Sequence, residues 1–182
     1  MRYFLSLALT LIFVDVKAQA KLEIQVGGSN VAGITINSAY DISLGKNPHV
    51  LTPYFGIGMI VPIWLEPSSI IHVGLDYHYK NCGLGTELSG FATNPFITSD
   101  NTNDFVDLVV YPNISYTFGK HSNWYYKITA GAYFAFSKYY NSQVQKTKME
   151  FEGDVFPGIG FTIGYKLIKT VPNNSSSRHG GI

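Results

Sequence analysis

The chain has 182 residues, of which 14% are charged and 15% are aromatic, and its formal net charge is +1 at pH 7. Average proteins carry about 25% charged residues, so this chain is poor in charge and rich in aromatic side chains. Its 13 basic residues are almost balanced by 12 acidic ones. It therefore lacks the excess positive charge that nucleic-acid binding requires, and we expect no nucleic-acid partner.

The first twenty residues have the pattern of a secretory signal peptide. Arg2 provides a positive start, Tyr3–Val14 is apolar, and Ala18-Gln19-Ala20 is a small-x-small cleavage site. We expect a mature chain that begins near Lys21 and is formally neutral. The only cysteine, Cys82, excludes an intramolecular disulfide. After the signal, no apolar stretch reaches the roughly 18 residues that a membrane-spanning helix needs.

The rest of the chain alternates between apolar and polar residues, which predicts strands with one apolar face. Ordinary strands have about 5–6 residues, whereas crossing a bilayer as a tilted strand takes roughly 9–11, and these segments have the greater length. In chain order the predicted strands are Leu22–Ile36, Thr52–Ile63, Ile70–Lys80, Phe105–Phe118, Trp124–Lys138 and Val155–Leu167.

Two of these strands carry further detail. The first contains Gly27-Gly28-Ser29-Asn30, which is either a bend or a turn between two short strands. We favour one bent strand, because seven residues would not cross a bilayer. In the fifth strand the apolar face has aromatic residues at both ends, and the step from Tyr126 to Phe134 is about 26 Å at ~3.3 Å per residue. At a tilt of about 40° this spans roughly 20 Å, near the ~25 Å apolar band of outer-membrane barrels.

The predicted connections alternate in length, as they do between the extracellular loops and periplasmic turns of outer-membrane barrels. The long ones are Asn37–Leu51, Asn81–Asp104 and Tyr139–Asp154, and the short ones are Trp64–Ser69 and Gly119–Asn123. This pattern places the N-terminus in the periplasm and the three long loops outside the cell.

Four segments carry a resemblance to a known family. They are the opening strand Leu22–Gly28, the aromatic strand Ile70–Gly83 that ends in Tyr-x-x-x-Gly, Phe105–Gly119 with its mid-strand proline and terminal Phe-Gly, and Ile128–Phe136 with its Ala-Gly-x-Tyr centre. In order and spacing they resemble the small outer-membrane β-barrel family of Gram-negative bacteria, the OmpX/PorT-like group. The resemblance covers most of Lys21–Leu167.

This resemblance implies an all-β fold, a small antiparallel up-and-down transmembrane barrel of eight strands. It implies contact with outer-membrane lipid and with the barrel-assembly machinery. The chain departs from the family because six strands are clear rather than eight. Eight are reached by splitting Leu22–Leu44 into two and counting Val144–Phe151 as another. The aromatic end signal also differs, since Gly160–Tyr165 lies 17 residues before Ile182. The expected organisation is a signal peptide over 1–20, a barrel domain over 21–169 and a polar tail over 170–182.

Charged and histidine side chains on the polar face allow two interpretations, a structural network in the lumen or a catalytic site. They are Glu23, His72, Asp76, His78, Lys80, Asp107, Lys127 and Lys166. We expect Glu23, Asp76 and Asp107 to pair with the lysines, because charges inside a barrel must be paired. A Ser-His-Asp site would need Ser115 near His78. His72 and His78 are about 20 Å apart along a strand at ~3.3 Å per residue, too far to share a metal.

We therefore expect a non-enzymatic outer-membrane barrel with a lumen filled by side chains and with no catalytic residues, metal or cofactor. Its extracellular loops would bind an unidentified ligand or mediate adhesion, or the protein would act in envelope biogenesis. Two alternatives remain open. One is a soluble secreted barrel like a lipocalin, which would turn its apolar face inward around a ligand, and the other is an outer-membrane lipid-modifying enzyme.

Overall fold

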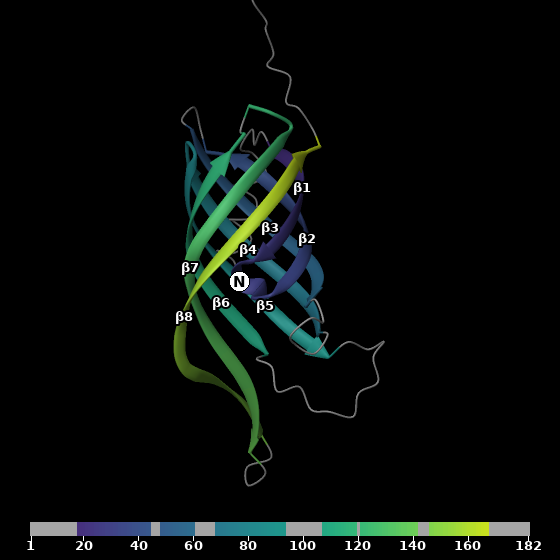
Figure 1. Ribbon diagram of the computed structural model, residues 1–182, viewed down its shortest axis with the longest axis vertical. Coiled ribbons are helices and arrows are strands. Elements are labelled where there is room, and N and C mark those ends of the chain that lie inside the picture. The colour runs from purple at the N-terminus through teal and green to yellow at the C-terminus, as the bar shows by residue number, and fades with distance from the viewer. Residues whose placement is uncertain are drawn as a thin grey trace, which may run out of the picture.

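The structure is a computed structural model that describes residues 18–44, 48–60, 68–93, 107–119, 121–141 and 146–167. They form a closed barrel of eight antiparallel strands in which each strand pairs with its neighbours in the chain (Figure 1). The strands are β1 Ala18–Gly27, β2 Gly33–Ser43, β3 His49–Ile60, β4 Ser68–Tyr79, β5 Cys82–Thr93, β6 Leu108–Phe118, β7 Trp124–Asn141 and β8 Lys146–Lys166. The predicted eight-stranded up-and-down barrel is confirmed.

The barrel closes between its first and last strands. β1 pairs antiparallel with β8 from Lys21 opposite Lys166 to Gly27 opposite Gly160. We call the end where β1 begins and β8 ends the termini end, and the opposite end the loop end. Because the strands alternate in direction, β2–β3, β4–β5 and β6–β7 are joined at the termini end. The other pairs are joined at the loop end.

The prediction of one bent strand over Leu22–Ile36 is wrong, because the chain reverses in its middle. A 3-10 turn, η1 Gly28–Asn30, joins β1 to β2. Gly27 and Gly28 have φ of 72° and 61°, values that glycine adopts without steric cost. The apolar residues before and after the turn still face the same side of the sheet, which is why the alternation continues through it.

The split of Leu22–Leu44 into two strands, one of the two ways to reach eight, is confirmed by β1 and β2. The other, Val144–Phe151, is wrong as a separate strand, because residues 146–151 belong to β8, and the strand missing from the prediction is β5. The outward side of β5 has few large apolar residues, among them Leu84 and Leu88, and its inward side begins with Gly83 and Gly85. Alternation was therefore weak there, and Asn81–Asp104 was interpreted as a loop.

The predicted loop Asn37–Leu51 is also wrong, because most of it lies in β2 and β3. These two strands are joined at the termini end. Residues 64–67 of the predicted short connection Trp64–Ser69 lie outside the described residues, but β3 ends and β4 begins at the loop end, opposite to the end predicted.

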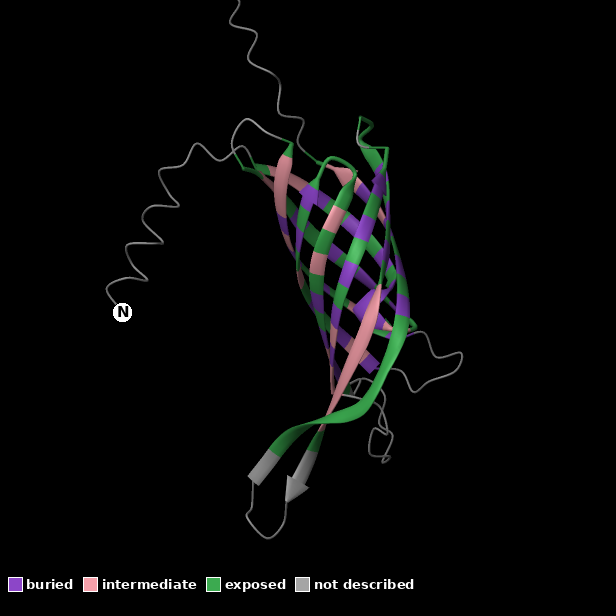
Figure 2. Ribbon diagram, turned by 90° about the vertical axis from the view of Figure 1, so that its left-hand side faces the viewer, coloured by how far each residue is buried: buried purple, intermediate pink, exposed green. Residues whose placement is uncertain are grey.

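β7 and β8 extend beyond the barrel as a paired hairpin at the loop end, shown clearly in Figures 1 and 2. Their pairing runs from Trp124–Tyr165 to Asn141–Lys146, with a register shift between Phe134 and Phe136. The predicted loop Tyr139–Asp154 is therefore largely strand.

Residues 1–17 and the predicted polar tail 170–182 lie outside the described residues, and so do residues 168 and 169 of the predicted barrel domain. The predicted cleavage site Ala18-Gln19-Ala20 forms the start of β1.

No helix within the described part of the chain is long and apolar enough to cross a membrane.

Candidate functional site in the barrel lumen

The barrel buries its polar side chains and exposes its apolar ones. Among the described residues twenty buried positions are polar or charged and eight are hydrophobic, while thirty large hydrophobic side chains are exposed. Buried and exposed residues alternate along the strands within the barrel wall, whereas residues 131–137 of β7 are all intermediate and residues 148–157 of β8 are all exposed (Figure 2). Near the middle of the strands Ile57, Ile71 and Ile114 are 62%, 58% and 64% exposed. We call this apolar surface the outer belt. The lumen, by contrast, is the polar core of the protein.

The loop end of the lumen is closed by η1 and by an apolar cluster. Gly28, Ser29 and Asn30 are buried. The backbone N–H of Ser29 donates to Glu87 Oε2 at 3.0 Å, and the Ser29 hydroxyl lies 3.1 Å from His72 Nδ1. Beside the turn lies a cluster of buried apolar residues, Ile60, Ile70, Phe91 and Val109. This end of the lumen is therefore filled.

A buried ion pair lies in the middle of the lumen. Lys127 on β7 places Nζ 2.8 Å from Asp76 Oδ2 on β4, and the side chains are 3% and 0% exposed. His78 Nε2 is 3.7 Å from the same carboxylate oxygen, and Lys127 also lies over the ring of Tyr54 at 4.9 Å. The pair links strands on opposite sides of the barrel and compensates the cost of burying each charge.

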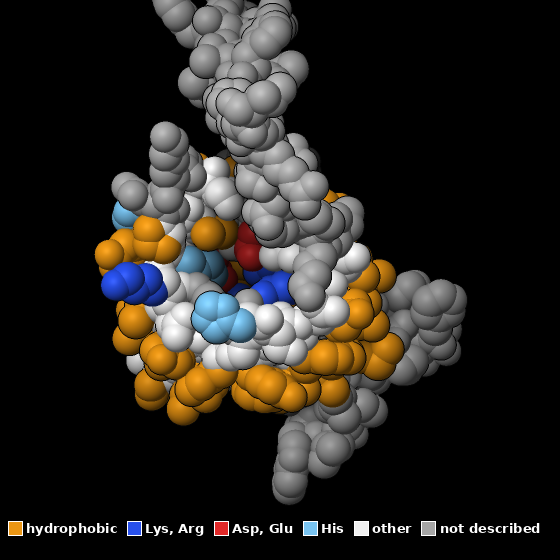
Figure 3. Space-filling view, turned by 90° about the horizontal axis from the view of Figure 1, so that it is seen from above, with side chains coloured by type: hydrophobic (Ala, Val, Ile, Leu, Met, Phe, Trp, Pro, Cys, Tyr) orange, Lys and Arg blue, Asp and Glu red, His pale blue; other side chains and the backbone are white. Residues whose placement is uncertain are grey.

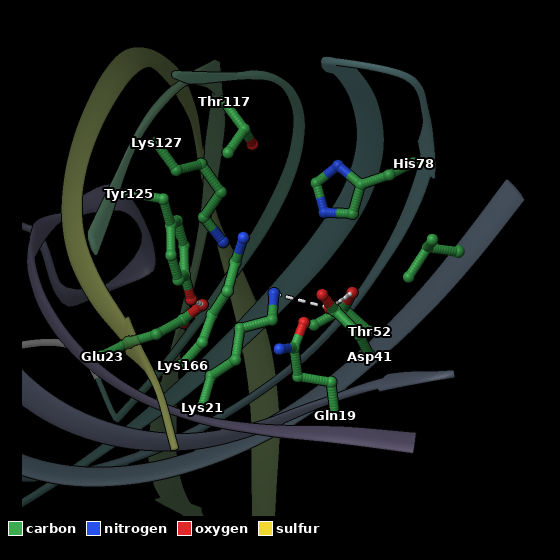
Figure 4. A pocket seen from close by; sticks show the side chains of 11 residues that line it. Gln19, Lys21, Glu23, Asp41, Thr52, His78, Thr117, Tyr125, Lys127 and Lys166 are labelled. Carbon is green, nitrogen blue, oxygen red and sulfur yellow. Dashed lines mark hydrogen bonds and ion pairs between the residues drawn. The ribbon is translucent and has the colours of Figure 1, made fainter. Parts of the chain in front are cut away.

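At the termini end the lumen opens into a cavity of about 190 Å³. Figure 3 shows charged and histidine side chains inside a hollow that is ringed by the apolar side chains of the outer belt. The cavity is lined by Gln19, Lys21, Glu23, Asp41, Val50, Thr52, His78, Thr117, Tyr125, Lys127 and Lys166, shown in Figure 4. We call it the mouth cavity. All its charged residues follow the predicted cleavage site.

Hydrogen bonds fix the carboxylates of the mouth cavity. Lys21 Nζ is 2.5 Å from Asp41 Oδ1, which also accepts a hydrogen bond from the Thr52 hydroxyl at 2.7 Å. The Tyr125 hydroxyl donates to Glu23 Oε1. The other oxygen of this carboxylate, Oε2, is buried and has no hydrogen-bond partner among the described residues. The cavity thus holds charges of both signs, and one oxygen of the Glu23 carboxylate, Oε2, lacks a donor among the described residues.

The expected pairing of lumen charges is confirmed for Asp76 and Lys127 and wrong for two other residues. Lys80 is exposed in the turn after β4, and Asp107 lies at the start of β6, where Lys138 Nζ is 3.6 Å from its carboxylate. Glu23 accepts a hydrogen bond from the Tyr125 hydroxyl, and the pairing of Glu23 with a lysine stays a prediction.

Sequence reasoning missed two buried or half-buried acids of the lumen, Asp41 and Glu87, because they fell in segments interpreted as loops. Both continue the polar parity of their strands. That continuation was the signal that could have identified them.

The residues considered for catalysis come close together but do not form a triad. Ser115 Oγ and His78 Nδ1 both flank Gly83, since a Cβ on Gly83 would clash with each of them. Neither atom has a hydrogen-bond partner among the described residues, so the serine is not bonded to the histidine that would activate it. His72 instead contacts Ser29 and Ser89. No group of three or more metal-ligating side chains occurs within the described ranges.

Comparison of the chain with models of protein families finds no match, and no curated protein or solved structure matches it either.

Proposed function

We propose that the protein is an integral outer-membrane β-barrel that crosses the bilayer with its eight strands and does not act as an open pore. The outer belt is the observation that carries this proposal. Soluble monomers rarely expose contiguous apolar patches larger than a few hundred Å², whereas here large apolar side chains cover the strands all round. In lipid such a belt is favourable, and closure leaves no unpaired strand edge in the hydrocarbon.

The aromatic residues of the belt support the same proposal. Trp124 and Tyr165 are in contact near the termini end, with ring centroids 5.0 Å apart. Phe134 and Phe151 contact each other towards the loop end at 6.1 Å. Aromatic girdles at both interfaces are typical of outer-membrane barrels. The soluble lipocalin-like alternative requires the apolar face to line the lumen, which is the opposite arrangement.

The predicted signal peptide supports export, and the termini end would then face the periplasm. The loop end would carry the binding, adhesion or envelope-biogenesis role that was expected of the loops. The described element that projects beyond the barrel at this end is the β7–β8 hairpin. β1 pairs with β8 only from Lys166 to Gly160, so the part of β8 before Gly160 forms the edge strand of the projecting hairpin. Such an edge can accept an extended segment of a partner protein.

The membrane proposal is tested by two arginine substitutions on exposed side chains. Ile114→Arg places a charge in the outer belt, since Ile114 on β6 lies opposite Ala130, midway between Tyr126 and Phe134 of β7. Glu150→Arg places one on the projecting hairpin. In lipid vesicles, Ile114→Arg should lower the free energy of unfolding by about 2–4 kcal/mol. Glu150→Arg, a surface change, should alter it by no more than about 0.5 kcal/mol.

Wild-type protein should also float with the vesicles in a density gradient. The proposal fails if the protein remains in the aqueous fraction, or if the two arginine variants are equally stable in vesicles. Either result would favour a water-exposed barrel.

A further inference from the structure

The mouth cavity has features of a ligand site that the membrane-spanning role does not require. Lys21, Lys127 and Lys166 extend into it from β1, β7 and β8. Figure 4 shows their ammonium groups pointing towards the same space. The negative side chains are Glu23 and Asp41 in the wall, together with Asp76, which is bonded to Lys127 just below. Three positive and three negative side chains therefore surround this end of the lumen.

The unpartnered oxygen of Glu23 indicates that a ligand of this cavity carries a positively charged donor group. Glu23 is 1% exposed, and its Oε2 receives no hydrogen bond from any described residue. A buried carboxylate oxygen without a donor is costly. A ligand with an ammonium group would supply the missing donor and a compensating charge.

The lysines of the cavity indicate that the same ligand also carries a carboxylate. An ammonium group has three donors, and the bonds of Lys21 to Asp41 and of Lys127 to Asp76 use one donor each. A carboxylate in the cavity would accept hydrogen bonds from the remaining donors. Charge-assisted bonds of this kind are about twice as strong as neutral ones.

The balance of charge selects between ligand classes. A phosphate or a simple amine would add an unbalanced charge to these three lysines and three acids, which together are neutral and mostly buried, and this is unfavourable. A molecule that carries one ammonium and one carboxylate adds none. The volume of the mouth cavity also limits the size of the ligand. A cavity of about 150 Å³ holds benzene, and the mouth cavity measures about 190 Å³, so only a small molecule fits.

We propose that the mouth cavity binds a small zwitterion of amino-acid size, with its ammonium group on Glu23 and its carboxylate among the lysines. The inference does not depend on the membrane proposal, since it concerns the lumen alone and can be tested in detergent.

The test is calorimetric titration of the folded protein in neutral detergent with L-alanine, sodium acetate, methylammonium chloride and inorganic phosphate. Alanine should bind and should raise the unfolding temperature as its concentration rises, whereas the other three should do neither. The fold of each sample is checked by its faster gel migration without boiling.

Glu23→Gln is the decisive variant, since it keeps the side-chain volume and the oxygen that accepts from Tyr125. It should weaken alanine binding roughly ten- to hundred-fold, as expected for the loss of a charge-assisted hydrogen bond. It should also give the set of three lysines and three acids a net positive charge and admit acetate or phosphate. Glu87→Gln is the matched control, because Glu87 is another buried carboxylate of the lumen that does not line the cavity, and it should leave alanine affinity unchanged.

Lys166→Met provides a second variant if Glu23→Gln does not fold, and it should weaken alanine binding while admitting methylammonium. Three results would overturn the proposal. They are the absence of alanine binding to folded wild-type protein, binding of phosphate in preference to alanine, and equal effects of the Glu23 and Glu87 substitutions.

Discussion

Replacing Lys127 by methionine tests whether the polar lumen stabilises the fold. The ammonium group lies 2.8 Å from Asp76 Oδ2, and both side chains are almost fully buried. Removing one partner of a buried ion pair leaves an uncompensated charge, which costs about 3–5 kcal/mol. Lys138→Met is the matched control, because Lys138 pairs with Asp107 at 3.6 Å with side chains that are 57% and 29% exposed. An exposed pair contributes about 0–1 kcal/mol.

The assay is urea unfolding of the refolded barrel in detergent micelles, followed by tryptophan fluorescence and by gel mobility without boiling. Asp76→Asn and the double variant with Lys127→Met complete a double-mutant cycle. The double variant should lose less stability than the two single variants together, with a coupling energy of at least about 1.5 kcal/mol. The reasoning is refuted if Lys127→Met costs no more than Lys138→Met, or if the cycle is additive.

Three further predictions concern packing, conduction and orientation. Gly74→Ala should lower the free energy of unfolding by about 1–3 kcal/mol, because its Cβ would overlap the ring of a lumen tyrosine. Gly90→Ala, whose nearest atom would be 4.0 Å away, should cost little in the same urea titration. Because the loop end of the lumen is filled, the protein should give no sugar flux in a liposome-swelling assay, and measurable flux would contradict the closed lumen. In intact cells a membrane-impermeant maleimide should leave Cys82 at the termini end unlabelled and should label a Cys82→Ser/Asp154→Cys variant, and the reverse result would invert the proposed orientation.

Alternation predicted the strands whose outward faces are uniformly apolar. β3, β4, β6 and β7 were found within a few residues of their observed bounds, because nearly every second residue on them is apolar. Two features could not be obtained in this way. The turn at η1 preserves the parity of the chain, so the alternation did not distinguish a turn from a bend at these glycines, and β5 carries too few large apolar residues on its outward side. Closing the barrel with eight strands requires both the turn and β5.

The lumen was harder to predict than the belt, because its contacts cross the barrel. Parity placed Lys127 and Asp76 on the inner face, but their meeting depends on the number of strands and on the register. A count of six strands puts different side chains opposite one another. The mouth cavity was not predicted either. One of its lining residues, Asp41, was assigned to a loop rather than to a strand.

Glycines on the inner face explain how an eight-stranded barrel can be filled at one end and hollow at the other. Tyr54 on β3 pairs with Gly74 on β4, and Tyr125 on β7 pairs with Gly164 on β8. In both pairs the tyrosine ring occupies the place that a Cβ on the glycine would need. Each ring thus lies across its neighbouring strand rather than in the centre of the lumen. At the termini end this leaves the centre to the charged tips of long side chains, which keep a polar space between them. Because that space is bounded by groups of both signs and is closed from below, its chemistry favours selective binding of a small polar ligand over conduction.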